Sequence, residues 1–367
     1  MTPQLFAYIL KRLLLIVPTL LGILLVTFTL IQFVPGGPVE QMVQMLQGEH
    51  SGMGAGGPAA PGASATGDVG QTGGVYRGRV GVDPQRLEEI KALYGFDKPV
   101  HERFIDMVVG FMQFDLGKSF FHNKTVWELI VEKLPVSMSL GIWAFLITYL
   151  VSIPLGISKA VRHGSQFDLY TSLAILIGYA IPGFVLGVVM LVFFGGGSFL
   201  QLFPLRGLTS DNWSELSLIG QVLDYFWHLA LPLTCLVLGS FAVVTMLTKN
   251  TMLEEIRRQY VLTARAKGLA EDTVLWRHVL RNAMIPIITG FPAAFVGAFF
   301  TGSLLIETLF SLDGLGLLSY EAVMKRDYPV VMGTLFFFSL LGLMAKLIND
   351  LMYVLVDPRV QFGGSRS

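Results

Sequence analysis

The chain has 367 residues, of which 53% are hydrophobic and 14% are charged, and its mean hydropathy is +0.62. Soluble domains carry roughly 25% charged residues, so this composition excludes an ordinary soluble protein and indicates one embedded in lipid. Basic and acidic residues balance at 26 each, and a net charge of zero gives no indication of nucleic-acid binding. The single cysteine, Cys235, excludes a disulfide within the chain.

Six apolar runs are long enough to cross a membrane, which takes about 20 residues because every backbone N–H and C=O must be satisfied within the helix. They cover about residues 13–34, 134–158, 169–195, 226–248, 283–306 and 329–356. We therefore predict an all-α integral membrane protein with six transmembrane helices. The first run is longer than the roughly 7–15 apolar residues of a secretory signal, and no small-residue cleavage site follows it, so we expect a retained span.

Several spans contain proline within or near their ends, and proline predicts kinks in membrane helices. These prolines are Pro154, Pro182, Pro232, Pro286 and Pro292. Gly183 and Gly187 form a GxxxG pair, which favours close approach of another helix. Only the last run contains charged residues, Lys346 and Asp350, which are one helical turn apart and can neutralise each other.

The distribution of Lys and Arg predicts that both termini face the cytoplasm, since short cytoplasmic loops are enriched in these residues. The short loops and termini on one side hold most of them: Lys11, Arg12, Lys159, Arg162, Lys249, Arg257, Arg258, Arg265, Lys267, Arg277, Arg281, Arg359 and Arg366. The short loops opposite hold only Arg206, Lys325 and Arg326. The chain then divides into a cytoplasmic N-terminus with the first span (1–34), an extracytoplasmic loop (35–133), a transmembrane core (134–356) with a cytoplasmic loop at 249–282, and a cytoplasmic tail (357–367).

The extracytoplasmic loop is predicted to begin with a flexible insert and to continue with short helices. Residues 48–74 are rich in Gly, Ala, Pro, Ser and Thr and bury too little surface to offset the entropy of ordering. Short helices are expected at about 84–115: Asp83 and Pro84 suit a helix start, Gly95 suits a stop, and an amphipathic pattern follows at 104–111. These helices could lie on the outer membrane surface, receive an extracytoplasmic partner, or form a lid over the ends of the spans.

The sequence offers little for catalysis or metal binding. Residues 117–119 read Gly-Lys-Ser, as at the end of a phosphate-binding loop, but Met112 stands where the first glycine of that motif belongs. Neither HExxH nor GxSxG occurs. His228 lies two helical turns from Cys235, and two candidate ligands favour a packing role over a metal site. We expect no catalytic residue, metal site or cofactor in this chain.

The loop at 249–282 is polar and basic, and it lies between the fourth and fifth apolar runs. Ala264, Ala266 and Gly268 present little bulk, and the cations Arg265 and Lys267 lie between them. A short helix with small side chains can enter a groove on a partner whose acidic residues pair with those cations. A helix that lies on the membrane surface without a partner fits the same residues equally well.

Residues 260–282, YVLTARAKGLAEDTVLWRHVLRN, closely resemble the coupling-loop signature of ATP-binding-cassette (ABC) importer permeases of the dipeptide and oligopeptide class. Blocks at 11–38, 306–316, 326–329 and 350–359 are similar to other parts of that family, so the resemblance covers nearly the whole chain. Segments at 132–137, 178–184 and 203–210 look like its YejB-type branch. Two features depart from the wider family: Leu262 stands where the general signature begins with glutamate, and the insert at 48–74 is unusually long.

The resemblance implies the type I ABC importer permease fold in the bacterial cytoplasmic (inner) membrane, and uptake of peptides, including peptide-nucleotides of the microcin C kind. ATP and Mg²⁺ would bind a separate nucleotide-binding ATPase subunit. The other implied partners are a second homologous permease subunit and an extracytoplasmic peptide-binding protein. By the same resemblance, the residues that dock into the ATPase are Ala264, Arg265, Ala266, Lys267, Gly268 and Leu269. Closure of the ATPase would move this loop and switch the pore between outward and inward access.

Two other function classes fit the sequence less well. An ion-coupled secondary transporter without an ATPase partner normally needs ionisable groups or broken helices near the membrane midplane, and the first five apolar runs contain no charged residue. A membrane enzyme would need a catalytic motif that the sequence does not show. The residues that bind the substrate are not identified, because uncharged spans look alike on their lipid and lumen faces.

Overall fold

The computed structural model describes residues 3–33, 98–195, 199–300 and 303–356. Over these ranges the chain is helical and contains no β-strand, apart from an isolated bridge between Lys118 and Thr125. The chain divides into two compact units, one of residues 1–20, 127–322 and 334–367 and the other of residues 21–126 and 323–333. The first unit contains the polar loop at 249–282.

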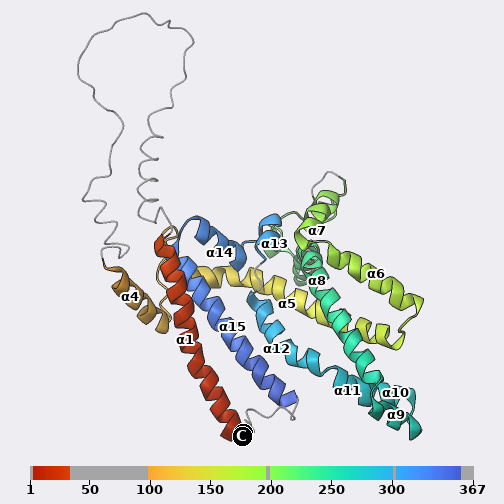
Figure 1. Ribbon diagram of the computed structural model, residues 1–367. Coiled ribbons are helices and arrows are strands. Elements are labelled where there is room, and N and C mark those ends of the chain that lie inside the picture. Colours follow the sequence, from red (N-terminus) through yellow and green to blue (C-terminus); the bar gives the residue numbers. More distant parts are fainter. Residues whose placement is uncertain (1–2, 34–97, 196–198, 301–302, 357–367) are drawn as a thin grey trace, which may run out of the picture. The chain divides into compact units, whose positions relative to one another are not determined.

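Among the described residues, four single helices are long and apolar enough to cross a membrane, and two bent pairs of helices bring the number of spans to six when each pair is taken as one span (Figure 1). The single helices are α1 (Pro3–Phe33), α5 (Val126–Val161), α8 (Leu218–Ile256) and α15 (Tyr328–Val356). The third span is α6 (Gln166–Ala180), then a 90° bend, then α7 (Gly183–Met190) with a π-helical turn, η1 (Leu191–Gly195). The fifth is α10 (Glu271–Thr273), η3 (Val274–Val279) and α11 (Leu280–Ala283), then a 49° bend, then α12 (Ile285–Phe300). The prediction of six transmembrane helices is confirmed.

Prolines mark the places where the two spans bend. Pro182 follows the 90° bend, and Ile181 before it has extended backbone (φ −87°, ψ 118°), because a residue that precedes proline is disfavoured in the helical region. Pro286 lies close to Met284, where the fifth span bends. The other three prolines, Pro154, Pro232 and Pro292, lie within continuous helices. The predicted kinks are therefore confirmed at Pro182 and beside Pro286.

Several span boundaries differ from those predicted, since α1 begins at Pro3 and α8 covers Leu218–Ile256, both beyond the apolar runs. α5 begins at Val126, before the apolar run, because its first turns carry polar residues such as Glu128 and continue the helix beyond the apolar part. The fifth run was predicted to end at 306, but Ile306 belongs to a separate short helix, α13 (Leu304–Leu309), which precedes α14 (Leu315–Met324). Hydropathy does not separate the span from α13, since both are apolar.

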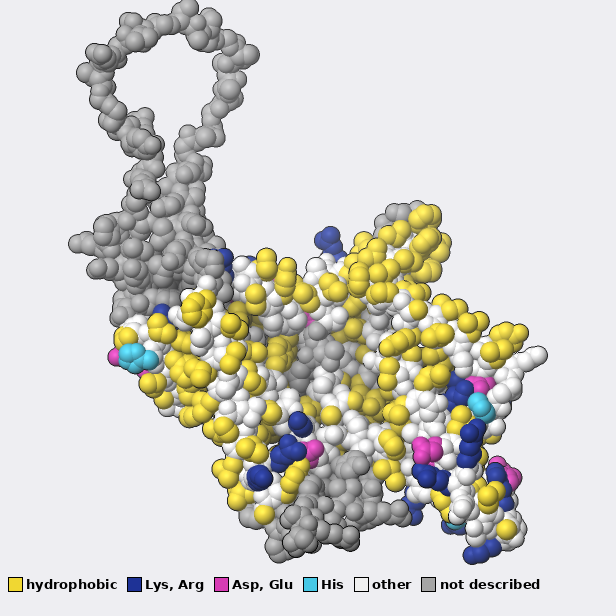
Figure 2. Space-filling view, in the orientation of Figure 1, with side chains coloured by type: hydrophobic (Ala, Val, Ile, Leu, Met, Phe, Trp, Pro, Cys, Tyr) yellow, Lys and Arg dark blue, Asp and Glu magenta, His cyan; other side chains and the backbone are white. Residues whose placement is uncertain are grey.

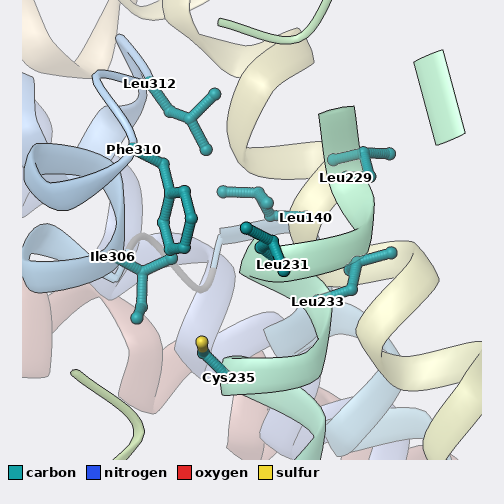
Figure 3. Close-up of a cluster of buried hydrophobic side chains, with 8 residues drawn as sticks. All are labelled: Leu140, Leu229, Leu231, Leu233, Cys235, Ile306, Phe310 and Leu312. Atoms are coloured by element: carbon teal, nitrogen blue, oxygen red, sulfur yellow. The ribbon is translucent and has the colours of Figure 1, made fainter. Parts of the chain in front are cut away.

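The core of the first unit joins α5, α8 and α13 (Figure 3). Its buried side chains are Leu140, Leu229, Leu231, Leu233, Cys235, Ile306, Phe310 and Leu312. α7 packs closely here: a Cβ added to Gly183 would lie 2.7 Å from the carbonyl oxygen of Cys235, and one added to Gly187 would lie 2.6 Å from Leu309 Cδ2. The close helix approach predicted from the GxxxG pair is confirmed, and Cys235 has the expected packing role.

In the second unit, α4 (Val100–Met112) packs against the later part of α1. The Phe28 and Phe104 rings lie 5.3 Å apart, and Arg103 donates a hydrogen bond to Gln32 Oε1 at 3.0 Å. The amphipathic pattern at 104–111 falls within α4. The helix start predicted at Pro84 and the insert at 48–74 lie outside the described residues.

The Gly-Lys-Ser segment at 117–119 has a structural role in the same unit. Ser119 Oγ makes a short hydrogen bond to Asp327 Oδ2, and the Phe120 backbone N–H donates to Oδ1 at 3.0 Å. Asp327 is buried and directly precedes α15. Its carboxylate therefore holds this loop against the start of the last span.

Substitution of Gly141 tests how closely α5 and α12 pack. A Cβ on Gly141 would overlap the carbonyl oxygen of Ala298 in α12, whereas one on Gly290 in α12 would have nothing within 4 Å. We expect Gly141→Ala to destabilise the protein by about 1–3 kcal/mol, as overpacking does. Gly290→Ala should be neutral or stabilising by roughly 0.5–1 kcal/mol, the helix preference of alanine over glycine. Thermal unfolding in detergent measures both, and equal unfolding temperatures would contradict this close packing.

Candidate functional site

The polar loop at 249–282 folds into a short helix, α9 (Gln259–Ala266), and a sharp turn. Gly268 lies in the left-handed region (φ +77°), and its N–H donates to the Arg265 carbonyl oxygen at 2.9 Å. Glycine is favoured at this position after a helix because it has no Cβ to be strained. The chain then enters α10 and the fifth span. Figure 1 shows α9, α10 and α11 together at the end of α8.

Buried apolar side chains fix α9 to its neighbours. They are Ala160 of α5, Met252 of α8, Val261 and Ala264 of α9, Val274 and Val279 of η3, and Ala283 of α11. We call this set the α9 cluster. Because it joins α9 to the ends of the second, fourth and fifth spans, a displacement of α9 is passed to all three.

The outer side of α9 and the turn after it are exposed. Among the residues implied to dock, the exposed ones are Arg265, Ala266, Lys267, Gly268 and Leu269. Ala264 is different, because it is only 7% exposed and belongs to the α9 cluster. Leu262 is 58% exposed and adds a large apolar side chain to the outer surface. This surface therefore consists mainly of small and apolar side chains, with cations beside them.

Side-chain hydrogen bonds hold both ends of α9, from Arg265 to α10 across the turn and from Tyr260 to α8. Arg265 Nε and Nη2 donate to the two carboxylate oxygens of Glu271 at 2.8 and 3.0 Å. Tyr260 Oη donates to Glu255 Oε2 at 2.6 Å, and burial raises the pKa of Tyr260, so the hydroxyl keeps its proton at neutral pH. Arg265 is thus already paired within the chain, which leaves fewer cations for a partner's acidic residues than the sequence predicted.

Charged side chains gather around this end of the molecule. Figure 2 shows Lys, Arg, Asp and Glu side chains together in the region where Figure 1 places α9 and α10, while apolar side chains cover much of the face elsewhere. Long apolar side chains on the spans, such as Leu150, Leu173 and Val243, are more than half exposed. An apolar exterior suits lipid tails or another membrane helix, so α9 lies at the edge of the membrane.

A cavity of about 880 Å³ lies among α5, α6, α7, α8 and α12. None of the described residues that line it is charged, and its polar side chains are Thr148, Tyr149, Tyr179, Ser240 and Ser303. Ile181 and Pro182, at the bend between α6 and α7, also line it. In a membrane, non-helical backbone is tolerated only where protein covers it or where it lines a water-filled cavity. The bend is compatible with a membrane because α8 packs against it at Gly183 and the cavity adjoins it.

Aromatic rings form one wall of this cavity. Phe145 lies 4.5 Å from Tyr149 and 4.9 Å from Phe291, measured between ring centroids. Phe145 and Tyr149 line the cavity, and Phe291 of α12 supports both rings. Such a wall can contact a solute through ring faces and hydroxyl groups without holding a charge in place.

The motif at 306–316 encloses a buried carboxylate. Glu307 Oε2 accepts a hydrogen bond from the Leu317 N–H at 2.7 Å, and Ser137 of α5 donates to Oε1 at 3.4 Å. Ser137 also accepts from the Leu315 N–H at 2.9 Å. A Cβ on Gly314 would lie 2.5 Å from Glu307 Cδ, so this close approach requires glycine. Burial raises the pKa of Glu307, and the loop folded around it is tied to α5.

Asp350 pairs with α1 rather than with its neighbour on α15. Arg12 Nη2 lies 3.0 Å from Asp350 Oδ2, and Tyr8 Oη donates to the same oxygen at 3.0 Å. Lys346, the partner suggested by the sequence, is exposed and makes no ion pair among the described residues. The charge in the last span therefore serves as a tie between α1 and α15.

Residues 152–362 match the family model described as "Binding-protein-dependent transport system inner membrane component". The chain belongs to this family. It is 54% identical over 363 residues to the peptidoglycan transport system permease protein YejB of Agrobacterium fabrum, covering 97% of this chain and 98% of that protein. It is 52% identical over 361 residues to the inner membrane ABC transporter permease protein YejB of Escherichia coli O157:H7, covering 98% and 99%. Identity to the dipeptide transport system permease protein DppB of Escherichia coli K12 is 32% over 376 residues, covering 96% and 98%.

The resemblance inferred from the sequence motifs is thereby confirmed. The permease has the type I ABC importer fold, and it is a transport subunit rather than an enzyme. The family does not support the alternative of an ion-coupled secondary transporter.

Ala264 and Ala266 separate the buried side of α9 from the exposed side. We expect Ala264→Leu to destabilise the permease by about 1–3 kcal/mol, because it overpacks the α9 cluster. Ala266→Leu should change stability by less than about 0.5 kcal/mol, as surface substitutions usually do. Thermal unfolding of the purified variants in detergent measures the difference. A larger loss for Ala266→Leu would show that α9 turns its other side toward the spans.

Proposed function

We propose that the permease is the membrane subunit of an ATP-driven importer of peptides, and that α9 is where a separate ATPase subunit docks. The observation that carries this proposal is the two-sided character of α9. Its outer side exposes small and apolar side chains, while the α9 cluster ties its inner side to three spans. An element held in this way can pass motion from a partner to the membrane. ATP and Mg²⁺ would bind the ATPase, and this chain would hold no cofactor.

The docking surface would consist of residues 265–269 together with Leu262. Ala264 would contribute from the buried side, by setting how closely α9 approaches the spans. Closure of the ATPase would move α9 and the attached span ends, so that the cavity opens alternately to the two sides of the membrane. Six spans seldom enclose a peptide-sized path, so a second, homologous permease subunit would complete it.

The family also supports a second partner and a location. Its description as binding-protein-dependent supports delivery of the substrate by an extracytoplasmic peptide-binding protein. The same description, and the inner membrane named for a relative, support the bacterial inner membrane as the location. The concentration of Lys and Arg on one side of the spans supports a cytoplasmic position for both termini.

Peptides are the substrate class that the relatives and the cavity support best. Two relatives are named for transport of peptidoglycan and of dipeptides, and peptide bonds are common to both. The uncharged lining of the cavity would contact a peptide through hydroxyl groups and rings, without preference for one side-chain charge. Peptide-nucleotides of the microcin C kind are a narrower expectation within this class.

Gly268 variants test docking. Gly268→Trp places a large side chain in the exposed turn, and we expect peptide uptake to fall about tenfold or more, within the range of site-to-site coupling, with normal membrane insertion. Gly268→Asn is the matched control, because asparagine is small and tolerates the left-handed conformation, so it should keep most uptake. Uptake of labelled peptides by cells that carry only the variant gene, with immunoblots of the membranes, measures both. Normal ATP-dependent uptake by Gly268→Trp would refute the docking role.

A second pair of glycines tests the cavity as the solute path. A Cβ on Gly239 of α8, which lines the cavity, would have nothing within 4 Å, and the same holds for Gly290 of α12, which does not line it. We expect Gly239→Trp to reduce uptake about tenfold or more by filling the cavity, and Gly290→Trp to retain most uptake. The same uptake assay, corrected for the amount of each variant in the membrane, compares them. Equal uptake by the two variants would argue against this route.

A further inference from the structure

A buried ion cluster joins the ends of three spans next to the α9 cluster. Lys249 Nζ of α8 donates to both carboxylate oxygens of Asp168, at the start of α6, at 2.6 and 2.8 Å. Lys159 Nζ, near the end of α5, lies 3.2 Å from Asp168 Oδ1. All three side chains are buried. We call these three residues the Asp168 cluster.

Further hydrogen bonds fix the geometry of the Asp168 cluster. Lys159 Nζ donates to the Asp168 backbone oxygen at 3.0 Å and to the hydroxyl oxygens of Thr171 and Ser172, both at 2.7 Å. The Gly164 N–H donates to Asp168 Oδ2 at 3.3 Å. Because a buried charge without partners is costly, this arrangement is stable only while the three helix ends keep their relative positions.

The Asp168 cluster and the α9 cluster share the same stretches of α5 and α8. Ala160 directly follows Lys159, and Met252 lies about one helical turn after Lys249. Both Ala160 and Met252 belong to the α9 cluster, together with Val261 and Ala264 of α9. A force applied at α9 therefore reaches the residues that hold Asp168.

Polar bonds are needed here, because apolar packing fixes helices weakly where lipid tails are as apolar as the side chains. α5 and α8 are held by close contact, since a Cβ on Gly156 would lie 2.6 Å from Thr248 Cβ. α6 contributes no side chain to the α9 cluster. Asp168 links the start of α6 to α5 and α8, the two helices that contribute side chains to the α9 cluster.

We propose that Asp168 is a positioning residue for coupling: the Asp168 cluster makes the ends of α5, α6 and α8, together with α9, one rigid body. This inference rests on the proposed docking of an ATPase at α9. When the ATPase displaces α9, the third span moves with the second and fourth. The bend of the third span lines the cavity, so its movement alters the solute path.

The number of peptides imported per ATP hydrolysed tests the proposal in the complete transporter reconstituted in liposomes. Asp168→Asn keeps the shape of the side chain but removes the charge between the two lysines. We expect peptides per ATP to fall about tenfold while ATP hydrolysis continues. The matched control, Asp350→Asn, removes the tie between α1 and α15 and should leave the ratio unchanged. A normal ratio for Asp168→Asn overturns the proposal.

Lys249→Met tests the same link without leaving an unpaired buried charge, because Lys159 and Asp168 still neutralise each other. This variant removes only the bonds from α8 to Asp168. It keeps the proposal testable if Asp168→Asn does not fold. The expected result is again a reduced number of peptides per ATP, and a normal ratio counts against the rigid body.

Spin labels test the rigid body directly. We would introduce Gln259→Cys on α9 and Tyr170→Cys on α6, both exposed and both outside the proposed docking surface, in a Cys235→Ala background. With Asp168 present, the distance between the labels should be the same in the nucleotide-free and ATP-bound transporter. With Asp168→Asn, the distances in the two states should differ. A distance that changes between states while Asp168 is present overturns the proposal.

The two proposals fail in different ways. Normal uptake by Gly268→Trp removes the docking role of α9. If Gly268→Trp blocks uptake while Asp168→Asn keeps a normal number of peptides per ATP, docking stands and only the rigid body fails.

Discussion

Contact between α9 and the ends of three spans is the constraint on which the rest of the structure depends. The buried side chains of this packing include the small Ala160 and Ala264, together with Val261. Because this inner side of α9 is fully occupied, the outer side and the turn at Gly268 remain exposed. The same packing that holds α9 to the membrane domain therefore also defines the surface it offers to a partner.

The helices that hold α9 are also the helices that line the cavity. Ala160 lies at one end of α5 and Phe145 lies in the cavity wall of the same helix, roughly 22 Å away at 1.5 Å per residue. α8 has the same arrangement, with Met252 in the α9 cluster and Gly239 in the cavity wall. A continuous helix transmits a tilt along its length, so a displacement at α9 needs no further element to reach the cavity.

Sequence alone predicted the spans and marked the two bends among five candidate prolines, because a run of apolar residues and a proline act locally. It missed the Asp168 cluster because each apolar run stops one residue short of Lys159, Asp168 or Lys249, and their pairing depends on three helices meeting. Asp350 shows the same limit: spacing could suggest only a partner on its own helix, whereas Arg12 comes from α1. The burial of Ala264 could be predicted from the sequence, since Val261 lies about one helical turn earlier and indicates that this face of α9 is apolar.

Buried carboxylates and apolar packing hold different parts of the structure in position. Asp168, Glu307 and Asp327 each accept hydrogen bonds from a segment far away in the sequence, and each lies at or beside the end of a helix. Such bonds have defined partners and directions, so they fix helix ends in position. The middle parts of the spans are apolar and are held by close packing, as between Gly141 and Ala298. Directional hydrogen bonds therefore position the helix ends, while apolar packing holds the spans between them, so a displacement at one end is carried along a helix that stays in contact with its neighbours.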